Sequence, residues 1–245
     1  MAKESKPPDV DGASDYVAVF TPETDLDPER VCLVVVDMQY ATGTRTTGLG
    51  KRLAAQGKLQ DAEYRFARIE DYVVPNTKRL LDFFREHDLR RIFLTYGSEV
   101  SDYSDLPEHV RELCIGTNNR VGEREHEIID ELKPLPNERV FNKIGASAFN
   151  STAIDIVLHV YGVNTLLFTG VSTGMCVEGT LRDAADHGFL SFMVEDACGA
   201  DSPAMHEASL TVVQRLFGQL TTTGEAIERL EAKLGSKKPG VKATA

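Results

Sequence analysis

Short apolar runs alternate along the chain with segments that have helical spacing. The run "VCLVVVD" at 31–37 is continuously apolar, as expected for a strand covered on both faces. Runs of the same kind predict further strands at 91–97, 138–143, 164–171, 190–197 and, much shorter, at the start of 219–235. Strands that alternate with helices predict a parallel α/β sandwich with right-handed crossover connections.

The predicted helices lie between these strands. Within 69–89 the apolar residues recur at the spacing of one helix face. In another predicted helix, Ser202 is a candidate N-cap and Pro203 occupies the first helical position. The segment 39–57 is polar and contains several glycines, so no element is predicted there. The predicted helices cover 69–89, 152–163, 176–189, 202–218 and the end of 219–235.

The composition argues against some classes of binding partner. The 42% hydrophobic and 27% charged residues among 245 are the balance of an ordinary globular domain. The formal net charge of -11 argues against nucleic acid and anionic membranes, because no basic stripe offsets repulsion from their phosphates. No apolar run approaches the roughly 20 residues of a membrane span.

The two ends of the chain differ in composition from its middle. The start is polar, with prolines and no apolar stretch after its lysines, which predicts a mobile arm over 1–18 and no secretory signal. A disordered tail is predicted over 235–245, and a single domain over 19–234. The four cysteines lack CxxC spacing, which favours reduced thiols and a cytoplasmic location.

Three polar residues follow predicted strands, at the carboxyl ends where open parallel sheets collect their ligands. Asp37 follows the first strand, Lys143 the third, and Cys176 lies just past the fourth. Together they would supply a base, a cation and a nucleophile. Each also has an ordinary interpretation, respectively a turn aspartate, a surface lysine and a buried thiol.

The four cysteines differ in their surroundings. Cys176 follows the small-residue turn "TGVSTGM" and opens a predicted helix, where the helix N-terminus favours the thiolate. Cys32 lies inside the first strand. Cys114 and Cys198 have no cation, base or helix start clearly beside them. We therefore expect these last three to be structural.

Three segments carry a family resemblance. "VVVDMQ", "FNKIGASAFNSTAID" and "LLFTGVSTGMCVEGTLRDAADHGF" resemble the isochorismatase-like hydrolases, in particular their cysteine amidohydrolase branch. The likeness extends from Val31 to about Phe217, with gaps. It implies a Rossmann-like three-layer sandwich, with a six-stranded, mostly parallel sheet flanked by helices. It also implies a homo-oligomer that acts on a small molecule without a cofactor.

The resemblance assigns roles residue by residue. It places a catalytic triad on Asp37, Lys143 and Cys176, and an oxyanion hole on the backbone N–H groups of Ser172 and Cys176. A cis peptide bond is implied between Val171 and Ser172. The implied activity is cleavage of the C–N bond of a small amide or of a ureido or carbamoyl compound. The reaction would pass through a thioester and release ammonia or an amine.

Four more residues lie at or after strand ends near the proposed triad, and we interpret them as candidate substrate contacts: Gln39, Tyr40, Tyr96 and Phe149. Gln39 and Tyr40 would offer hydrogen bonds, and Phe149 a flat apolar wall. Core packing is the alternative for Phe149.

Two departures from the family pattern leave alternatives open. The stretch "DMQYATGTRTTGLG" is unusual and predicts a pocket wall, a lid or a subunit contact. The Asp-x-His element of nicotinamidases is missing from "TYGSEVSDYSDLPEH", where His109 stands alone, so we expect no metal and disfavour nicotinamide. A nicotinamidase-like carboxamide hydrolase and a non-catalytic nucleotide- or ligand-binding module remain the alternatives. The module lacks a G-x-G-x-x-G directly after the first strand.

Overall fold

The computed structural model describes Val17 and residues 24–236. Apart from Val17, the predicted arm over 1–18 lies outside the described residues, and so does the predicted tail beyond residue 236. The last helix includes residues 235 and 236, the first two of that tail.

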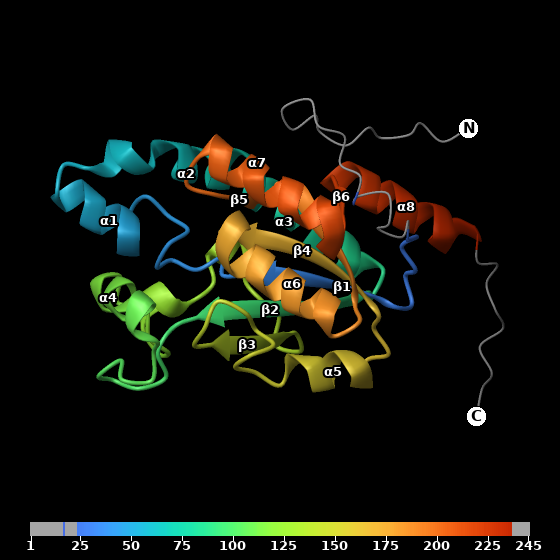
Figure 1. The fold of residues 1–245 in the computed structure, drawn as a ribbon, viewed down its shortest axis with the longest axis horizontal. Coiled ribbons are helices and arrows are strands. Elements are labelled where there is room, and N and C mark those ends of the chain that lie inside the picture. The colour runs from blue at the N-terminus through green and yellow to red at the C-terminus, as the bar shows by residue number, and fades with distance from the viewer. Residues whose placement is uncertain (1–16, 18–23, 237–245) are drawn as a thin grey trace.

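Six strands form one sheet in the part of the chain that the structure describes. Their order is β3-β2-β1-β4-β5-β6 and every pairing is parallel, which confirms the predicted Rossmann-like sandwich (Figure 1). The strands are β1 (Val31–Val36), β2 (Arg90–Tyr96), β3 (Arg139–Lys143), β4 (Thr165–Val171), β5 (Leu190–Gly199) and β6 (Gln219–Thr221). The direction of strand order reverses between β1 and β4, which is where a sheet of this type opens a crevice at its carboxyl edge.

Helices cover both faces of the sheet (Figure 1). Those described are α1 (Gly48–Ala55), α2 (Glu63–Arg68), α3 (Val74–Glu86), α4 (Glu108–Gly116), α5 (Ile154–Val160), α6 (Glu178–Asp186), α7 (Pro203–Val212) and α8 (Thr223–Ser236). Short 3-10 or π turns are η2 (Leu59–Ala62), η3 (Ile69–Val73), η4 (Arg124–His126), η5 (Asp130–Leu132), η6 (Thr173–Val177) and η7 (Val213–Phe217). The predicted cap is confirmed, because the Ser202 hydroxyl accepts a hydrogen bond from the Met205 N–H.

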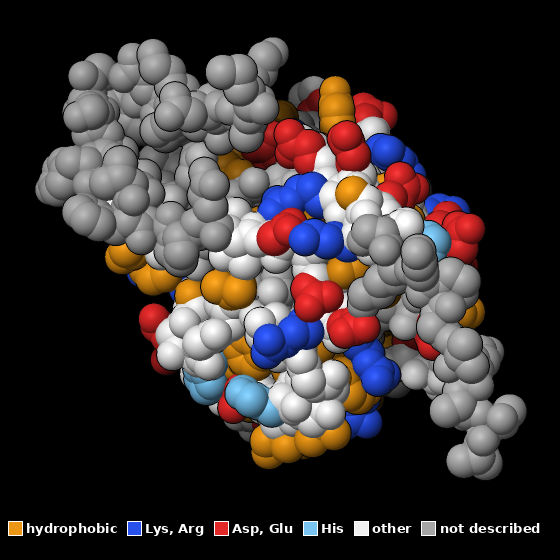
Figure 2. All heavy atoms as spheres, turned by 90° about the vertical axis from the view of Figure 1, so that its right-hand side faces the viewer, with side chains coloured by type: hydrophobic (Ala, Val, Ile, Leu, Met, Phe, Trp, Pro, Cys, Tyr) orange, Lys and Arg blue, Asp and Glu red, His pale blue; other side chains and the backbone are white. Residues whose placement is uncertain are grey.

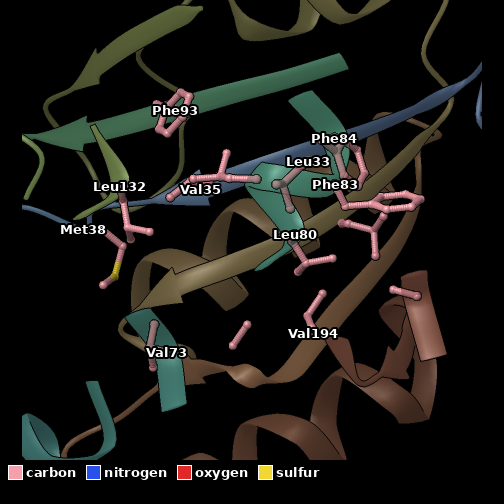
Figure 3. Close-up of a cluster of buried hydrophobic side chains, with 14 of the residues drawn as sticks. Leu33, Val35, Met38, Val73, Leu80, Phe83, Phe84, Phe93, Leu132 and Val194 are labelled. Carbon is pink, nitrogen blue, oxygen red and sulfur yellow. The ribbon is translucent and has the colours of Figure 1, made fainter. Parts of the chain in front are cut away.

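The hydrophobic core lies in two layers, one on each side of the sheet. Leu33 and Val35 of β1 belong to the cluster that includes residues of α3 and α8, and Figure 3 shows part of this cluster. Val34 and Val36 belong to the opposite cluster, with residues of α5, α6 and α7. Because successive strand side chains point to opposite faces, a strand buried on both sides must be apolar throughout, as β1 is.

The region between β1 and β2 holds more helix than the sequence predicts. The polar segment 39–57 contains α1, and a nearly continuous helical run leads from η2 through α2 and η3 into α3. The wide turn η3 ends just before Pro75 near the start of α3. Proline lacks the N–H that a regular turn requires, and a local change in helix type accommodates it. The helix α4 was likewise not predicted.

The two ends of the sheet present different surfaces. The arrows of β2 and β3 in Figure 1 point to the left, so the carboxyl edge lies on that side. Figure 2 shows the right-hand face of Figure 1, where acidic and basic side chains lie interspersed on the described surface. No helix in the described part of the chain is both long and apolar enough to cross a membrane.

Candidate active site

Asp37 and Lys143 form a buried ion pair at the carboxyl edge of the sheet. Nζ of Lys143 lies 2.8 Å from Oδ2 of Asp37, and the two side chains are 0% and 7% exposed. The same ammonium donates to the Gly145 carbonyl at 3.2 Å and lies 4.3 Å from the centre of the Tyr96 ring. A buried ammonium is costly unless it is paired, and these partners replace the water that it has lost.

Asp37 occupies the first position after β1 in an uncommon backbone conformation. Its φ is +52°, a value that aspartate and asparagine tolerate better than most residues. Its N–H donates to the Leu94 carbonyl of β2 at 3.0 Å. Oδ1 of Asp37, unlike Oδ2, is buried without a hydrogen-bond partner of normal geometry in the described structure. An acceptor is therefore left open on this carboxylate.

Cys176 lies in the turn that follows β4. The predicted cis peptide bond between Val171 and Ser172 is present, and the wide turn η6 follows it. Within this turn the Ser172 carbonyl accepts hydrogen bonds from the N–H groups of Met175 and Val177. Wide helical turns of this kind are frequent at functional sites.

Cys176 also differs from the other three cysteines in exposure. Cys176 as a whole residue is partly exposed, whereas Cys32, Cys114 and Cys198 are buried, as predicted for structural thiols.

The surroundings of Cys176 keep its thiol protonated. Burial among protein atoms raises the pKa of Cys176 to about 12, and the negative charge of Asp37 adds to the rise. Lys143 acts in the opposite direction without cancelling it. The expectation that the helix start favours the thiolate is therefore wrong for the resting state, because desolvation outweighs the partial charge of one helix end.

Lys143 stays charged in the same surroundings. Burial by itself would lower the pKa of Lys143, but the negative charge of Asp37 and the hydrogen bond to it raise the pKa, and the net change is upward. The three side chains interact as one unit. A neutral thiol, an open carboxylate oxygen and a fixed ammonium can together move a proton away from sulfur when an electrophile arrives.

Gln39 lies close to the ion pair but has its side chain fully engaged. Its Nε2 faces the Tyr96 carbonyl at 3.1 Å and the His126 carbonyl at 2.7 Å, and its Oε1 accepts from the Tyr96 N–H at 2.8 Å. A third acceptor, Oδ1 of Asn119, lies 3.2 Å from Nε2. These bonds tie the ends of β1 and β2 together, so a substrate contact by Gln39 would have to replace one of them.

Tyr96 and Tyr40 lie in different surroundings. Tyr96 is 8% exposed, its ring faces the Lys143 ammonium, and its buried hydroxyl has no partner in the described structure. A substrate contact by this hydroxyl stays a prediction. The Tyr40 hydroxyl accepts from the Asp130 N–H at 3.1 Å, and its ring lies under the Arg124 guanidinium. Tyr40 thus fixes the segment around η5, and its role in substrate binding stays a prediction.

The Phe149 ring packs against two aromatic rings that are not part of the proposed triad. Its ring lies 4.9 Å from the His187 ring and 5.8 Å from the Phe189 ring. These two residues lie between the end of α6 and the start of β5, which is the amino edge of the sheet. These contacts favour the core-packing alternative for Phe149, and a substrate contact by this ring stays a prediction. The loop after β3 also contacts α6, where the Ala148 N–H donates to the Thr180 hydroxyl at 3.4 Å.

Arg65 near the site was missed by the sequence analysis. It lies on α2, is 5% exposed, and donates to the Ser172 hydroxyl at 2.8 Å. Its position four residues before the buried Ile69 and eight before the buried Val73 places it on the apolar face of a helix. A charged residue on such a face was the available signal. In the part of the chain that is described, no group of three or more His, Cys, Asp or Glu side chains could hold a metal ion.

Comparisons with known proteins identify the family. Residues 31–225 match the family model described as "Isochorismatase domain", so the chain belongs to the isochorismatase family. Ureidoacrylate amidohydrolase RutB of Pantoea ananatis is 26% identical over 231 residues, 88% of either chain. RutB of Acinetobacter baylyi is 28% identical over 214 residues, which are 81% of this chain and 82% of the relative.

Solved structures show the same fold. A cysteine hydrolase from Pseudomonas syringae pv. phaseolicola superposes with a TM-score of 0.72 at 25% identity, covering 86% of this chain and 97% of that one. N-carbamoylsarcosine amidase from Thermoplasma acidophilum gives a TM-score of 0.58 at 23% identity, covering 80% and 98%. The second likeness is one of fold alone.

Proposed function

We propose that the chain is a cysteine-dependent amidohydrolase that cuts the C–N bond of a small amide or of a ureido or carbamoyl compound. The observation that carries this proposal is the buried Asp37–Lys143 pair, which interacts with the thiol of Cys176. Membership of the isochorismatase family and relatives named amidohydrolases support it.

In the first half of the proposed reaction, the open oxygen of Asp37 takes the proton from Cys176 as the sulfur attacks the substrate carbonyl. Lys143 stabilises the negative charge that moves between carboxylate and sulfur. The backbone N–H groups of Ser172 and Cys176 hold the developing oxyanion, and the loss of one such donor typically raises the barrier by about 2.7–4 kcal/mol. Asp37, now protonated, gives its proton to the departing nitrogen as the C–N bond breaks.

In the second half, water hydrolyses the thioester. Asp37 is again a carboxylate and takes a proton from the attacking water. Collapse of the tetrahedral adduct breaks the C–S bond, and the sulfur recovers its proton. The resting neutral thiol suits this cycle, because a base is present beside it at each step and no free thiolate has to be maintained.

The test compares Cys176→Ala and Cys176→Ser with Cys32→Ala, which removes a buried thiol from β1. We expect kcat to fall more than about 1,000-fold in both Cys176 variants and to change little in the control. Rapid quenching followed by intact-protein mass spectrometry should detect an acyl adduct on the wild type that is absent from Cys176→Ala. Near wild-type turnover by Cys176→Ala would reject the mechanism.

The substrate class within this proposal is a ureido or carbamoyl compound. The RutB relatives are named for ureidoacrylate, and this similarity favours that class over simple carboxamides. Ammonia release measured across ureas, carbamoyl compounds, biuret-like molecules, simple carboxamides and nicotinamide should be highest for the first groups. A clear preference for nicotinamide would instead support the nicotinamidase-like alternative.

A homo-oligomer and a cytoplasmic location complete the proposal. The first is suggested by the family and the second by four unpaired cysteines. Size-exclusion chromatography with light scattering tests the assembly, and a mass equal to the single chain of 27.0 kDa would contradict it.

A further inference from the structure

The segment between β1 and α3 contacts the catalytic turn through two arginines of α2. Arg65 and Arg68 are three residues apart and so lie on neighbouring positions of one helix face. Arg65 is buried, and a buried guanidinium is costly unless its donors are satisfied. The hydrogen-bond partners of Arg65 therefore indicate which segments α2 holds in place.

Arg65 joins three segments that are far apart in the sequence. Its Nη1 donates to the Ser172 hydroxyl at 2.8 Å and to Oδ1 of Asp201 at 2.9 Å, and its Nε donates to the Thr42 carbonyl at 3.2 Å. The Asp201 side chain is 47% exposed, whereas that of Arg65 is 6% exposed. Of the two side-chain contacts of Arg65, the one with Ser172, directly after β4, is therefore more buried than the one with Asp201.

Arg68 reaches the next residue of the same turn through a histidine. It donates to the carbonyls of Cys198 at 2.8 Å and Glu195 at 2.9 Å, and lies 2.8 Å from Nε2 of His206. A guanidinium can only donate, so Nε2 of His206 must accept. The ring hydrogen then belongs to Nδ1, which donates to the Thr173 hydroxyl at 2.9 Å.

The Ser172 hydroxyl is thus bound by Arg65, and the Thr173 hydroxyl is bound through His206 by Arg68. Ser172 immediately precedes η6 and Thr173 is its first residue, and the stretch from Ser172 to Cys176 contains both proposed oxyanion donors. Arg65, Arg68 and His206 are named here the α2 brace. Since Thr173 is fully buried and His206 is 3% exposed, these contacts do not compete with bulk water.

We infer that the α2 brace positions the oxyanion turn, with Arg65 acting through the Ser172 hydroxyl and Arg68 through His206 and Thr173. This role presupposes the amidohydrolase mechanism proposed above. Arg65 also links the α2 brace to the unusual segment after β1, through the Thr42 carbonyl. The three are positioning residues, because they bind protein groups and their effect on the reaction passes through the backbone of the turn.

The expected effect is on the chemical step more than on binding. An oxyanion forms only as the carbonyl is attacked, so donors displaced by a fraction of an ångström lose their value in the transition state. A misplacement of about 1 Å can cost on the order of 100-fold in rate. We expect Arg65→Met to lower kcat about 10- to 100-fold while KM changes less than about threefold.

The test is a double-mutant cycle of Arg65→Met and Ser172→Ala on the full chain, with the best substrate of the amide panel. Ser172→Ala removes the hydroxyl and keeps the backbone N–H. If Arg65 acts through that hydroxyl, the double variant should be no slower than the slower single variant. Multiplied losses, a loss confined to KM, or unchanged kcat in Arg65→Met would overturn the inference. Arg45→Met is the matched control, because in the described structure the ion pairs of Arg45 are with Glu63 and Glu70, outside the turn after β4.

Alkylation of Cys176 by iodoacetamide separates positioning from general damage. This substitution at a saturated carbon forms no oxyanion, so its rate should stay within about threefold of wild type in Arg65→Met and Thr173→Val. A parallel fall in alkylation and turnover would indicate that the whole site is disordered and would overturn the inference. Thr173→Val and Ser172→Ala, which each remove one hydroxyl, serve if Arg65→Met fails to fold.

Cys176→Ala, measured beside these variants, distinguishes the two levels of proposal. Loss of activity in Cys176→Ala with normal activity in Arg65→Met would reject the α2 brace alone. Equal activity of Cys176→Ala and wild type would reject the amidohydrolase mechanism, and the α2 brace with it.

Discussion

Replacement of Lys143 by methionine should separate the stability of the site from its activity. Two unit charges 2.8 Å apart attract each other by about 6 kcal/mol at an effective dielectric constant near 20. The variant Lys143→Met removes the ammonium and leaves the Asp37 carboxylate buried. Breaking a buried pair in this way typically costs about 3–5 kcal/mol, a large part of the roughly 5–15 kcal/mol that stabilises a domain.

The double variant Asp37→Asn with Lys143→Met should regain most of that loss. It leaves no uncompensated charge, and replacing both partners of a buried pair is often neutral or stabilising. Asparagine also tolerates the positive φ of position 37. Activity should be lost in both single variants and in the double variant, because each lacks a triad member.

Urea unfolding at pH 7 of the wild type, the two single variants and the double variant gives the coupling free energy directly. The reasoning would be refuted if Lys143→Met lost less than about 1 kcal/mol, or if the double variant were no more stable than Lys143→Met. Either result would mean that water screens the pair, contrary to its burial.

Three further outcomes follow from the structure. Since the pKa of Cys176 is raised to about 12, its alkylation rate should rise about tenfold per pH unit from pH 7 to 10, and a plateau at or below pH 9 would contradict this. Burial, with Arg68, lowers the pKa of His206 to about 4, so the unfolded chain binds a proton there below pH 6.5 before the folded one does. The free energy of unfolding should therefore fall by up to about 3 kcal/mol between pH 6.5 and 4, and His206→Gln should flatten that slope in urea unfolding curves; equal slopes would exclude His206 as the source. Gly170 has φ +111°, and a Cβ there would lie 2.0 Å from the Val36 carbonyl oxygen. Gly170→Ala should therefore lower the free energy of unfolding by more than about 2 kcal/mol, whereas Gly145→Ala, whose Cβ would have nothing within 4 Å, should change it by less than about 0.5 kcal/mol. Equal losses in the two variants would refute the steric argument.

Local patterns in the sequence were sufficient for the sheet, and they singled out Asp37, Lys143 and Cys176 as candidate site residues. A strand covered on both faces must be continuously apolar, so β1 and β4 could be recognised without knowing their neighbours. Parallel strands place their carboxyl ends at one edge, so Asp37 and Lys143 could be expected to meet although about a hundred residues separate them. The resemblance to the isochorismatase-like hydrolases implied the cis bond before Ser172, which the structure contains.

Helices whose apolar residues do not recur at helical spacing were harder to predict. The segment holding α1 and α2 is rich in polar residues and glycine, and its helices are fixed by what they pack against more than by their own propensity. The same limit applied to α4, whose only buried residue is Cys114.

The chemistry of individual side chains was decided by tertiary structure alone. Spacing shows which residues follow a strand, but not what approaches them from elsewhere in the chain. The contacts of Phe149 with Phe189, the engagement of Gln39 by the β2 end, and the reach of Arg65 to Ser172 all join segments distant in sequence. The protonation of Cys176 also depends on the tertiary structure, because the desolvation that raises its pKa comes from the atoms packed around the sulfur.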